Sequence, residues 1–154
     1  MKSSHSISEP LQQNTYRARL EFVMDYQFDP LIHRMIDKYG WEELETRECF
    51  EDMKRYLCLA AQTGKPLVPS PRIDEIWHNF ILFTMDYSEF CLTKLGRFIH
   101  HRPRRRDDEP SRGNHVGLTI RLAQEFFGTL SANWNFPGLK MEAQCTCSNW
   151  CQCS

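Results

Sequence analysis

The segment from Asp74 to His101 concentrates the side chains that could do chemistry. It reads DEIWHNFILFTMDYSEFCLTKLGRFIHH. Asp74 and His78 are four residues apart, so on a helix they share one face. Imidazole, thiolate and carboxylate groups are the ligands that Zn²⁺ takes in proteins. We therefore predict a zinc-like site, mainly structural, whose ligands are His78, Asp74, Cys91 and one of His100 or His101.

A single straight helix would keep two of these ligands apart. His78 and Cys91 are thirteen residues apart, which places them on nearly opposite faces and about 20 Å apart along the axis. Thr84 is a suitable cap for a second helix, and Asp86 suits its first turn. We therefore predict a departure from regular helix between Thr84 and Asp86, which folds 73–83 back on 85–95 as a hairpin. Asp74 then either binds the metal or orients His78.

The same residues also suit a hydrophobic core. A His beside a Trp on an apolar helix is usually a hydrogen-bonded core residue, and a buried Cys usually behaves as a small apolar side chain. In this alternative the chain is a non-enzymatic protein-interaction module with an unidentified protein partner, and its Trp-His and His-His pairs are structural. Both hypotheses place Trp77 and Tyr87 in the core.

A second group of possible ligands lies near the C-terminus. Its four cysteines form the pattern C-x-C-x3-C-x-C within nine residues: Cys145, Cys147, Cys151 and Cys153. Thiolates at this density can bind Cu(I) or Zn²⁺. The surrounding residues are almost all polar, so we expect 141–154 to be a flexible tail that uses its thiols for metal or redox chemistry, or else simply oxidises.

Other partners find little support. The arginines at 102–106 are followed at once by Asp107, Asp108 and Glu109, and no aromatic residues interleave to stack bases, so we do not expect nucleic-acid binding. No apolar run reaches the roughly 18 residues of a membrane span. The start MKSSHSISEP lacks the apolar stretch of a secretory signal. We therefore expect a cytoplasmic protein with reduced cysteines.

Enzymatic activity is not what the sequence favours. It contains no Gly-rich phosphate loop, no H-E-x-x-H and no nucleophile elbow. A zinc ion with an open position could activate water, but no convincing general base accompanies the predicted ligands.

The elements that must position the ligands are helices. Apolar residues recur at three- and four-residue spacing, which predicts helices over about 15–26, 30–39, 46–64 and 115–130, besides the segment 73–95. Between Ile76 and Phe83 most positions are apolar, as in a central helix. We predict an all-α fold of five or six helices around a central apolar helix or helical hairpin. The helical domain spans 15–140, after a flexible N-terminus over 1–14.

A family resemblance supports this fold. The stretch VPSPRIDEIWHNFILFTMDYSEFCLTKLGRFIHHRP resembles the helical region of glycine-rich domain-containing proteins and their short bacterial relatives. Their pattern D-x-x-W-H, then Tyr and Cys, then His-His-x-Pro falls here on Asp74, Trp77, His78, Tyr87, Cys91, His100, His101 and Pro103. The resemblance implies a compact helical domain but no reaction. Many relatives carry a second His where this sequence has Phe80.

Overall fold

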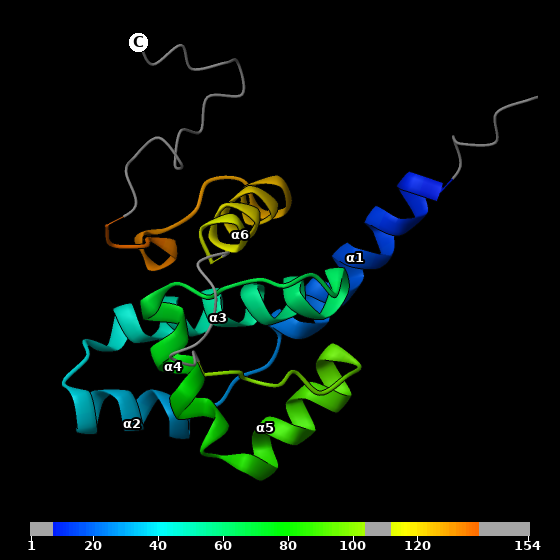
Figure 1. The fold of residues 1–154 in the computed structure, drawn as a ribbon. Helices are drawn as coiled ribbons and strands as arrows, with labels where there is room; N and C mark the ends of the chain where they lie inside the picture. The colour runs from blue at the N-terminus through cyan, green and yellow to red at the C-terminus, as the bar shows by residue number, and fades with distance from the viewer. Residues whose placement is uncertain (1–7, 104–111, 139–154) are drawn as a thin grey trace, which may run out of the picture.

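The computed structural model describes residues 8–103 and 112–138 (Figure 1). These residues contain helices and no strand, which confirms the prediction of an all-α fold. They form six α-helices, a π-helical turn, η1, after the fifth helix, and a short 3₁₀ helix, η2, after the sixth. In chain order the elements are α1 (Ser8–Met24), α2 (Asp29–Tyr39), α3 (Glu43–Thr63), α4 (Pro71–Ile81), α5 (Thr84–Phe90), η1 (Cys91–Leu95), α6 (Arg112–Phe127) and η2 (Ala132–Trp134).

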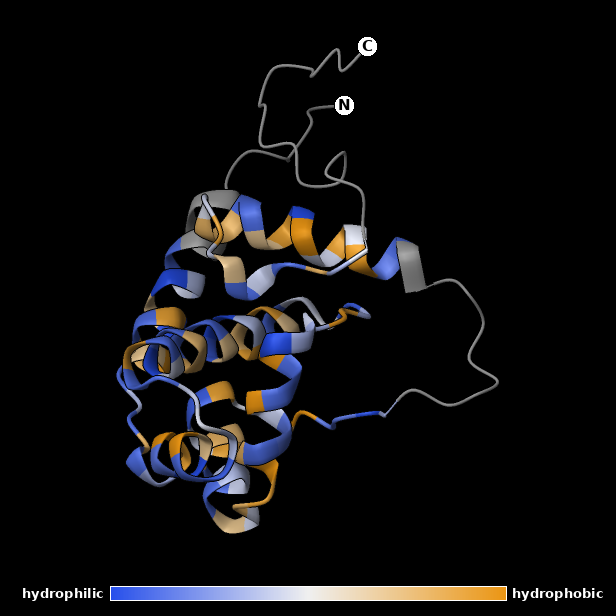
Figure 2. Cartoon of the chain, turned by 90° about the vertical axis from the view of Figure 1, so that its left-hand side faces the viewer, coloured by the Kyte–Doolittle hydropathy of each residue, from blue (hydrophilic) through white to orange (hydrophobic). Residues whose placement is uncertain are grey.

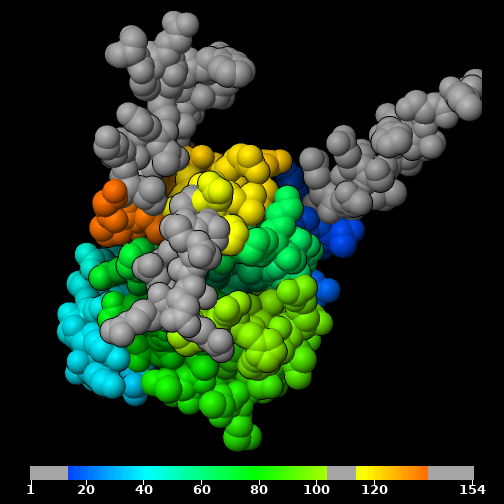
Figure 3. Space-filling model, in the orientation of Figure 1, coloured from blue at the N-terminus to red at the C-terminus, as the bar shows by residue number. Residues whose placement is uncertain are grey.

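Helix α3 lies at the centre of the body. It contacts α1, α2, α4, α6, η1 and η2. Figures 1 and 2 show α6 on one side of α3, with α2 and α5 on the other side. Helix α4 packs against α3 and also contacts α2, α5 and η2. Figure 2 shows apolar and polar residues mixed along each helix, as amphipathic helices require, and Figure 3 shows α6 and η2 covering one end of the body.

Local capping fixes where α4 begins. Ser70 is its N-cap and Pro71 its first residue, and the Ser70 hydroxyl accepts a hydrogen bond from the Ile73 amide at 3.3 Å. The same hydroxyl donates to the Asn133 carbonyl, which ties the start of α4 to η2. Helices α2 and α3 end at Gly40 and Gly64, both with left-handed φ near +60°, as the sequence predicts.

Two helix starts differ from the predictions. Helix α3 begins at Glu43, and the Glu42 side chain accepts from the Glu45 amide at 3.0 Å. The helix was expected to begin at about residue 46, but Thr46 is buried inside it, and its hydroxyl donates back to the Glu42 carbonyl. Helix α1 begins at Ser8, earlier than the expected residue 15. The predicted tail at 141–154 lies outside the described residues.

The predicted break between two helices is present, slightly earlier than expected. Helix α4 ends at Ile81 and α5 begins at Thr84, so the regular helix stops at Leu82 and Phe83. Thr84 does not cap α5, because Phe83 occupies the cap position and no side chain caps it. The Phe83 ring packs edge-on against Phe28, with centroids 5.1 Å apart, and this contact anchors the turn.

The core is rich in aromatic side chains, and it includes Trp77 and Tyr87 as predicted. Their side chains are 4% and 2% exposed. Phe80 is fully buried, with its ring near those of Tyr26, Phe28, Phe50, Tyr87 and Phe90. Position 80 therefore serves the core in this chain. None of the described helices is both long and apolar enough to cross a membrane.

Candidate metal centre

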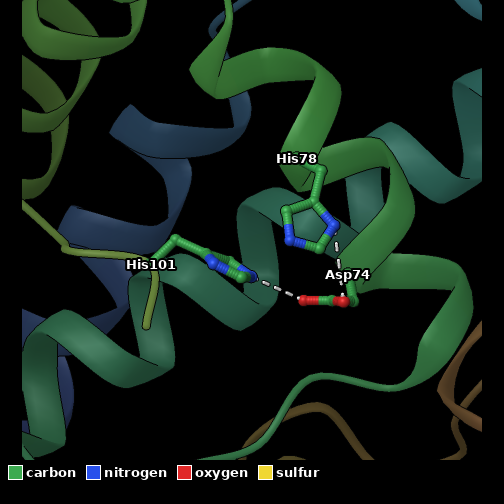
Figure 4. Close-up of side chains that lie close together, drawn as sticks. All are labelled: Asp74, His78 and His101. Carbon is green, nitrogen blue, oxygen red and sulfur yellow. Dashed lines mark hydrogen bonds and ion pairs between the residues drawn. The ribbon is translucent and has the colours of Figure 1, made fainter. Parts of the chain in front are cut away.

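Helix α4 presents two of the predicted ligands one turn apart. Asp74 and His78 are neighbours on its outer face, and the His78 Nδ1 atom lies 3.5 Å from the Asp74 Oδ2 atom (Figure 4). The cap at Ser70 fixes the helix start four residues before Asp74. The side chains of Asp74 and His78 are 34% and 49% exposed, so both face a region that solvent can enter.

The third side chain comes from the extended segment after η1. The left-handed Gly96, with φ of 80°, ends η1 and redirects the chain toward α4. The His101 Nε2 atom then lies 2.8 Å from the Asp74 Oδ1 atom, and its side chain is only 11% exposed (Figure 4). The imidazole contacts the Trp77 ring edge-on, with centroids 4.6 Å apart, which limits its freedom to turn away.

A buried hydrogen-bond chain holds this segment in place. The Trp77 indole N–H donates to the Tyr87 hydroxyl at 3.0 Å, and this hydroxyl donates to the Ile99 carbonyl at 2.6 Å. Ile99 precedes His101 by two residues, so the chain links α4 and α5 to the backbone that carries the third ligand. Tyr87 is thus a positioning residue for His101.

Together Asp74, His78 and His101 form the Asp-His-His cluster. One possible ligand atom from each side chain lies within 4.8 Å of the other two. Among the residues that the structure describes, these three are the group whose spacing suits a metal ion. The two imidazole centroids are 4.1 Å apart. A carboxylate and two imidazoles at this spacing can share a hydrogen-bonded proton or bind one metal ion.

The neighbouring Tyr56 remains neutral. Burial raises the pKa of its phenol, and the negative charge of Asp74 raises it further. The Tyr56 hydroxyl donates to the Leu67 carbonyl at 3.2 Å. Tyr56 therefore adds no negative charge beside the cluster.

Cys91 does not join the cluster. It is fully buried, and its thiol lies within hydrogen-bond range of the Tyr87 side chain and the Ile99 backbone. Burial raises the pKa of this thiol. The reason is the direction of the faces: Trp77 and Tyr87 point to the core, whereas His78 follows Trp77 by one residue and points about 100° away. The break between α4 and α5 therefore brings Cys91 to the core side of Trp77.

The two adjacent histidines, His100 and His101, lie in different surroundings. His101 turns to the cluster, whereas His100 is exposed and packs against Phe98, with ring centroids 4.7 Å apart. The four predicted cysteine ligands lie outside the described residues: Cys145, Cys147, Cys151 and Cys153.

A pocket of about 720 Å³ opens beside the cluster. Its floor includes Asp74, Trp77 and His78 of α4, and two extended segments form its walls. One wall is the proline-containing stretch 65–69, and the other is 97–103. The pocket also includes His115 of α6. An exogenous molecule could therefore reach the Asp-His-His cluster from this side.

Sequence reasoning missed several residues of this region. Tyr87 was assigned to the core but not to the positioning of a ligand, and Lys65, Arg97 and His115 were not considered. The proximity of Tyr87 to Cys91 could have been predicted from the sequence, because residues four apart share a helix face. The placement of Lys65 and Arg97 in the pocket had no such signal, since both come from segments without regular periodicity.

The fold and the site define a small all-helical domain with an Asp-His-His cluster at metal-binding spacing. The chain belongs to the UCP032817-like family, an uncharacterised family whose model matches residues 18–124 and so includes all three cluster residues. This match does not carry the glycine-rich domain-containing name that the resemblance suggested. No curated protein and no solved structure matches the chain.

Proposed function

We propose that this protein binds one divalent transition-metal ion, preferentially zinc, through Asp74, His78 and His101. The supporting observation is the convergence of the three ligand atoms within 4.8 Å. This ligand set keeps three of the residues that the sequence suggested and omits Cys91. Two imidazole nitrogens and one carboxylate oxygen are a donor set that suits zinc.

The distances fit a tetrahedral ion after a small adjustment. Zinc bonds of about 2.0–2.1 Å place neighbouring tetrahedral ligands about 3.3 Å apart. The His78 Nδ1 and Asp74 Oδ2 atoms are already 3.5 Å apart. The His101 Nε2 and Asp74 Oδ1 atoms, at 2.8 Å, would separate slightly as the metal replaces their hydrogen bond. The two imidazoles reach different oxygens of Asp74, so all three side chains must adjust for one carboxylate oxygen to share the ion with both nitrogens.

Three protein ligands leave one tetrahedral position for water or an exogenous ligand. The site is therefore open, unlike the closed four-ligand sites that only support a fold. We assign no reaction to it.

The four cysteines of the C-terminal segment form a separate proposed site. Their soft thiolates favour Cu(I) or Zn²⁺ as the bound ion.

A second candidate function is the protein-interaction module, in which the cluster is purely structural. The hydrogen bond between Asp74 and His101 favours it, because at 2.8 Å this bond is complete without an ion. In that case the bond fastens the 97–103 segment to α4, and metal binding is absent.

Metal binding by protein purified without an affinity tag separates the two functions. We expect one zinc ion per chain that depends on the cluster, measured by competition with a chromophoric chelator under reducing conditions. Because a metal needs deprotonated imidazoles, this binding should weaken on acidification. Asp74→Asn, His78→Ala and His101→Ala should each weaken it at least about tenfold.

The neighbouring His100→Ala serves as the matched control. It removes an exposed imidazole that lies beside the cluster but outside it, so zinc affinity should stay at the parent value. Equal binding by the parent and the three cluster variants would exclude the proposed site and favour the interaction module.

A further inference from the structure

We propose that the pocket beside the Asp-His-His cluster binds a small organic anion, whose carboxylate or phosphate oxygen takes the open position on the metal ion. This inference rests on the proposed metal site and extends it by naming a ligand class. The pocket opens directly onto Asp74, His78 and His101, so a molecule inside it can reach an ion that they hold.

The charge of the pocket favours an anion. Its described lining includes three cationic side chains, Lys65, Arg97 and Arg102, against the single carboxylate of Asp74. Within residues 8–103 and 112–138, neither Lys65 nor Arg97 makes an ion pair. A divalent ion bound to the cluster would more than cancel the negative charge of the Asp74 carboxylate. An entering ligand would therefore meet a net positive surface.

Lys65 and Arg97 both line the pocket, and the Arg97 side chain lies beside the residue before Lys65. A Cβ atom built on Gly64 would lie 3.8 Å from the Arg97 Nη1 atom. The guanidinium therefore lies next to Gly64, the residue before Lys65. This arrangement lets Arg97 and Lys65 converge on one anionic group, and a guanidinium can bind a carboxylate or phosphate with two parallel hydrogen bonds.

The remaining walls suit an organic body rather than a bare ion. Leu67 and Val68 are partly buried on one wall, and Phe98 on the other is 38% exposed. The volume of about 720 Å³ falls within the range of small-molecule sites. An anion with an attached apolar or aromatic group would therefore gain contacts that acetate or inorganic phosphate lacks.

Cobalt-substituted protein provides a direct test. Co²⁺ takes the place of zinc, and its visible absorption reports on the ligands that it binds. We expect inorganic phosphate, acetate and benzoate each to change the spectrum with saturation, and benzoate to bind more tightly than acetate. Arg97→Ala and Lys65→Ala should each weaken benzoate binding at least about tenfold, the loss expected for a hydrogen bond to a charged group. The control Arg17→Ala, an exposed residue of α1 outside the pocket, should leave it unchanged.

The outcomes distinguish this inference from the proposed function. Cobalt binding that depends on the cluster, with a spectrum that none of the three anions alters, would overturn the anion site and leave the metal site standing. Anion binding that the Arg97→Ala and Lys65→Ala variants retain in full would overturn the assigned pocket. Failure to bind cobalt or zinc at all would overturn both proposals.

Discussion

The Tyr87 hydroxyl and the Ile99 carbonyl are joined by a buried hydrogen bond of 2.6 Å. This bond couples the aromatic core to the segment that carries His101. Through the Trp77 indole, which donates to the same hydroxyl, the coupling extends to the helix that carries Asp74 and His78. The geometry of the cluster thus depends on Tyr87, which belongs neither to the cluster nor to the lining of the pocket.

Tyr87→Phe should reduce both stability and metal affinity. It leaves the Trp77 N–H and the Ile99 carbonyl without their partner, which should lower the free energy of unfolding by about 1–3 kcal/mol. Freed from this bond, the 97–103 segment should hold His101 less firmly, so zinc affinity should also fall. Urea unfolding and chelator competition measure the two effects. Tyr39→Phe is the control, since Tyr39 is 41% exposed and should tolerate the change.

Trp77→Ala should destabilise the whole fold. The indole is 4% exposed and packs near Tyr56 and His101, so its removal leaves a cavity that should cost about 3–5 kcal/mol. Trp77→Phe should cost less, because it keeps an aromatic ring and loses mainly the hydrogen bond. In thermal melts, the melting temperature should fall in the order parent, Trp77→Phe, Trp77→Ala. An Ala variant that melts with the parent would contradict the core placement.

Alkaline pH should destabilise the protein through its buried thiols. Burial raises the pKa of Cys49 to about 12 and that of Cys58 to about 11, compared with 9.0 for an ordinary thiol. Above pH 9 the unfolded chain therefore holds fewer protons than the folded one, so the free energy of unfolding falls as pH rises toward 11 or 12. Each thiol contributes about 1.4 kcal/mol per pH unit in this window.

A Cys58→Ala variant separates the thiol effect from that of the buried tyrosines. Its free energy of unfolding should fall less steeply than the parent's between pH 9 and 11, as measured by urea unfolding at each pH. Parallel curves for the two proteins would show that Cys58 ionises as easily in the folded state as in the unfolded one.

Removal of residues 141–154 should change metal stoichiometry but not the fold. The segment has one large apolar residue after position 141, Trp150, and its sequence therefore predicts too little burial to offset a backbone-ordering cost of about 1–2 kcal/mol per residue. Truncation should therefore leave helix content and melting temperature nearly unchanged. It should abolish thiol-dependent Cu(I) or zinc binding while the ion at the Asp-His-His cluster stays.

Metal titrations of both proteins under reducing conditions decide this point. Equal stoichiometry in the full-length and truncated chains would show that the cysteines hold no metal. A large loss of stability on truncation would show instead that the segment packs against the domain.

Helix positions were predictable because periodicity, caps and glycines act locally. The spacing of apolar residues located α2, and Gly40 and Gly64 marked two helix ends. The start of α3 was placed a few residues late, because Glu42 caps it and Glu is not among the residues that usually cap helices. The α4–α5 break was predictable in kind but not in position, because the packing of Phe83 on Phe28 is a tertiary contact.

The candidate site was predictable only where it lies on one helix. The pairing of Asp74 with His78 follows from four-residue spacing alone. The choice of His101 over His100 depends on how the chain leaves Gly96 and where Tyr87 fastens Ile99, which are tertiary relationships. The position of Cys91 outside the cluster could not be predicted for a related reason, since the sequence located a break without giving the rotation of the helix after it.

The different origins of the three ligands have a kinetic consequence. Asp74 and His78 come together as soon as α4 forms, whereas His101 is 27 residues beyond Asp74 and arrives only when the 97–103 segment docks. A metal ion would gain its third protein ligand late in folding, and that ligand would leave early in unfolding. We expect this contact to form after the folding transition state, so zinc should slow the unfolding rate and leave the folding rate nearly constant.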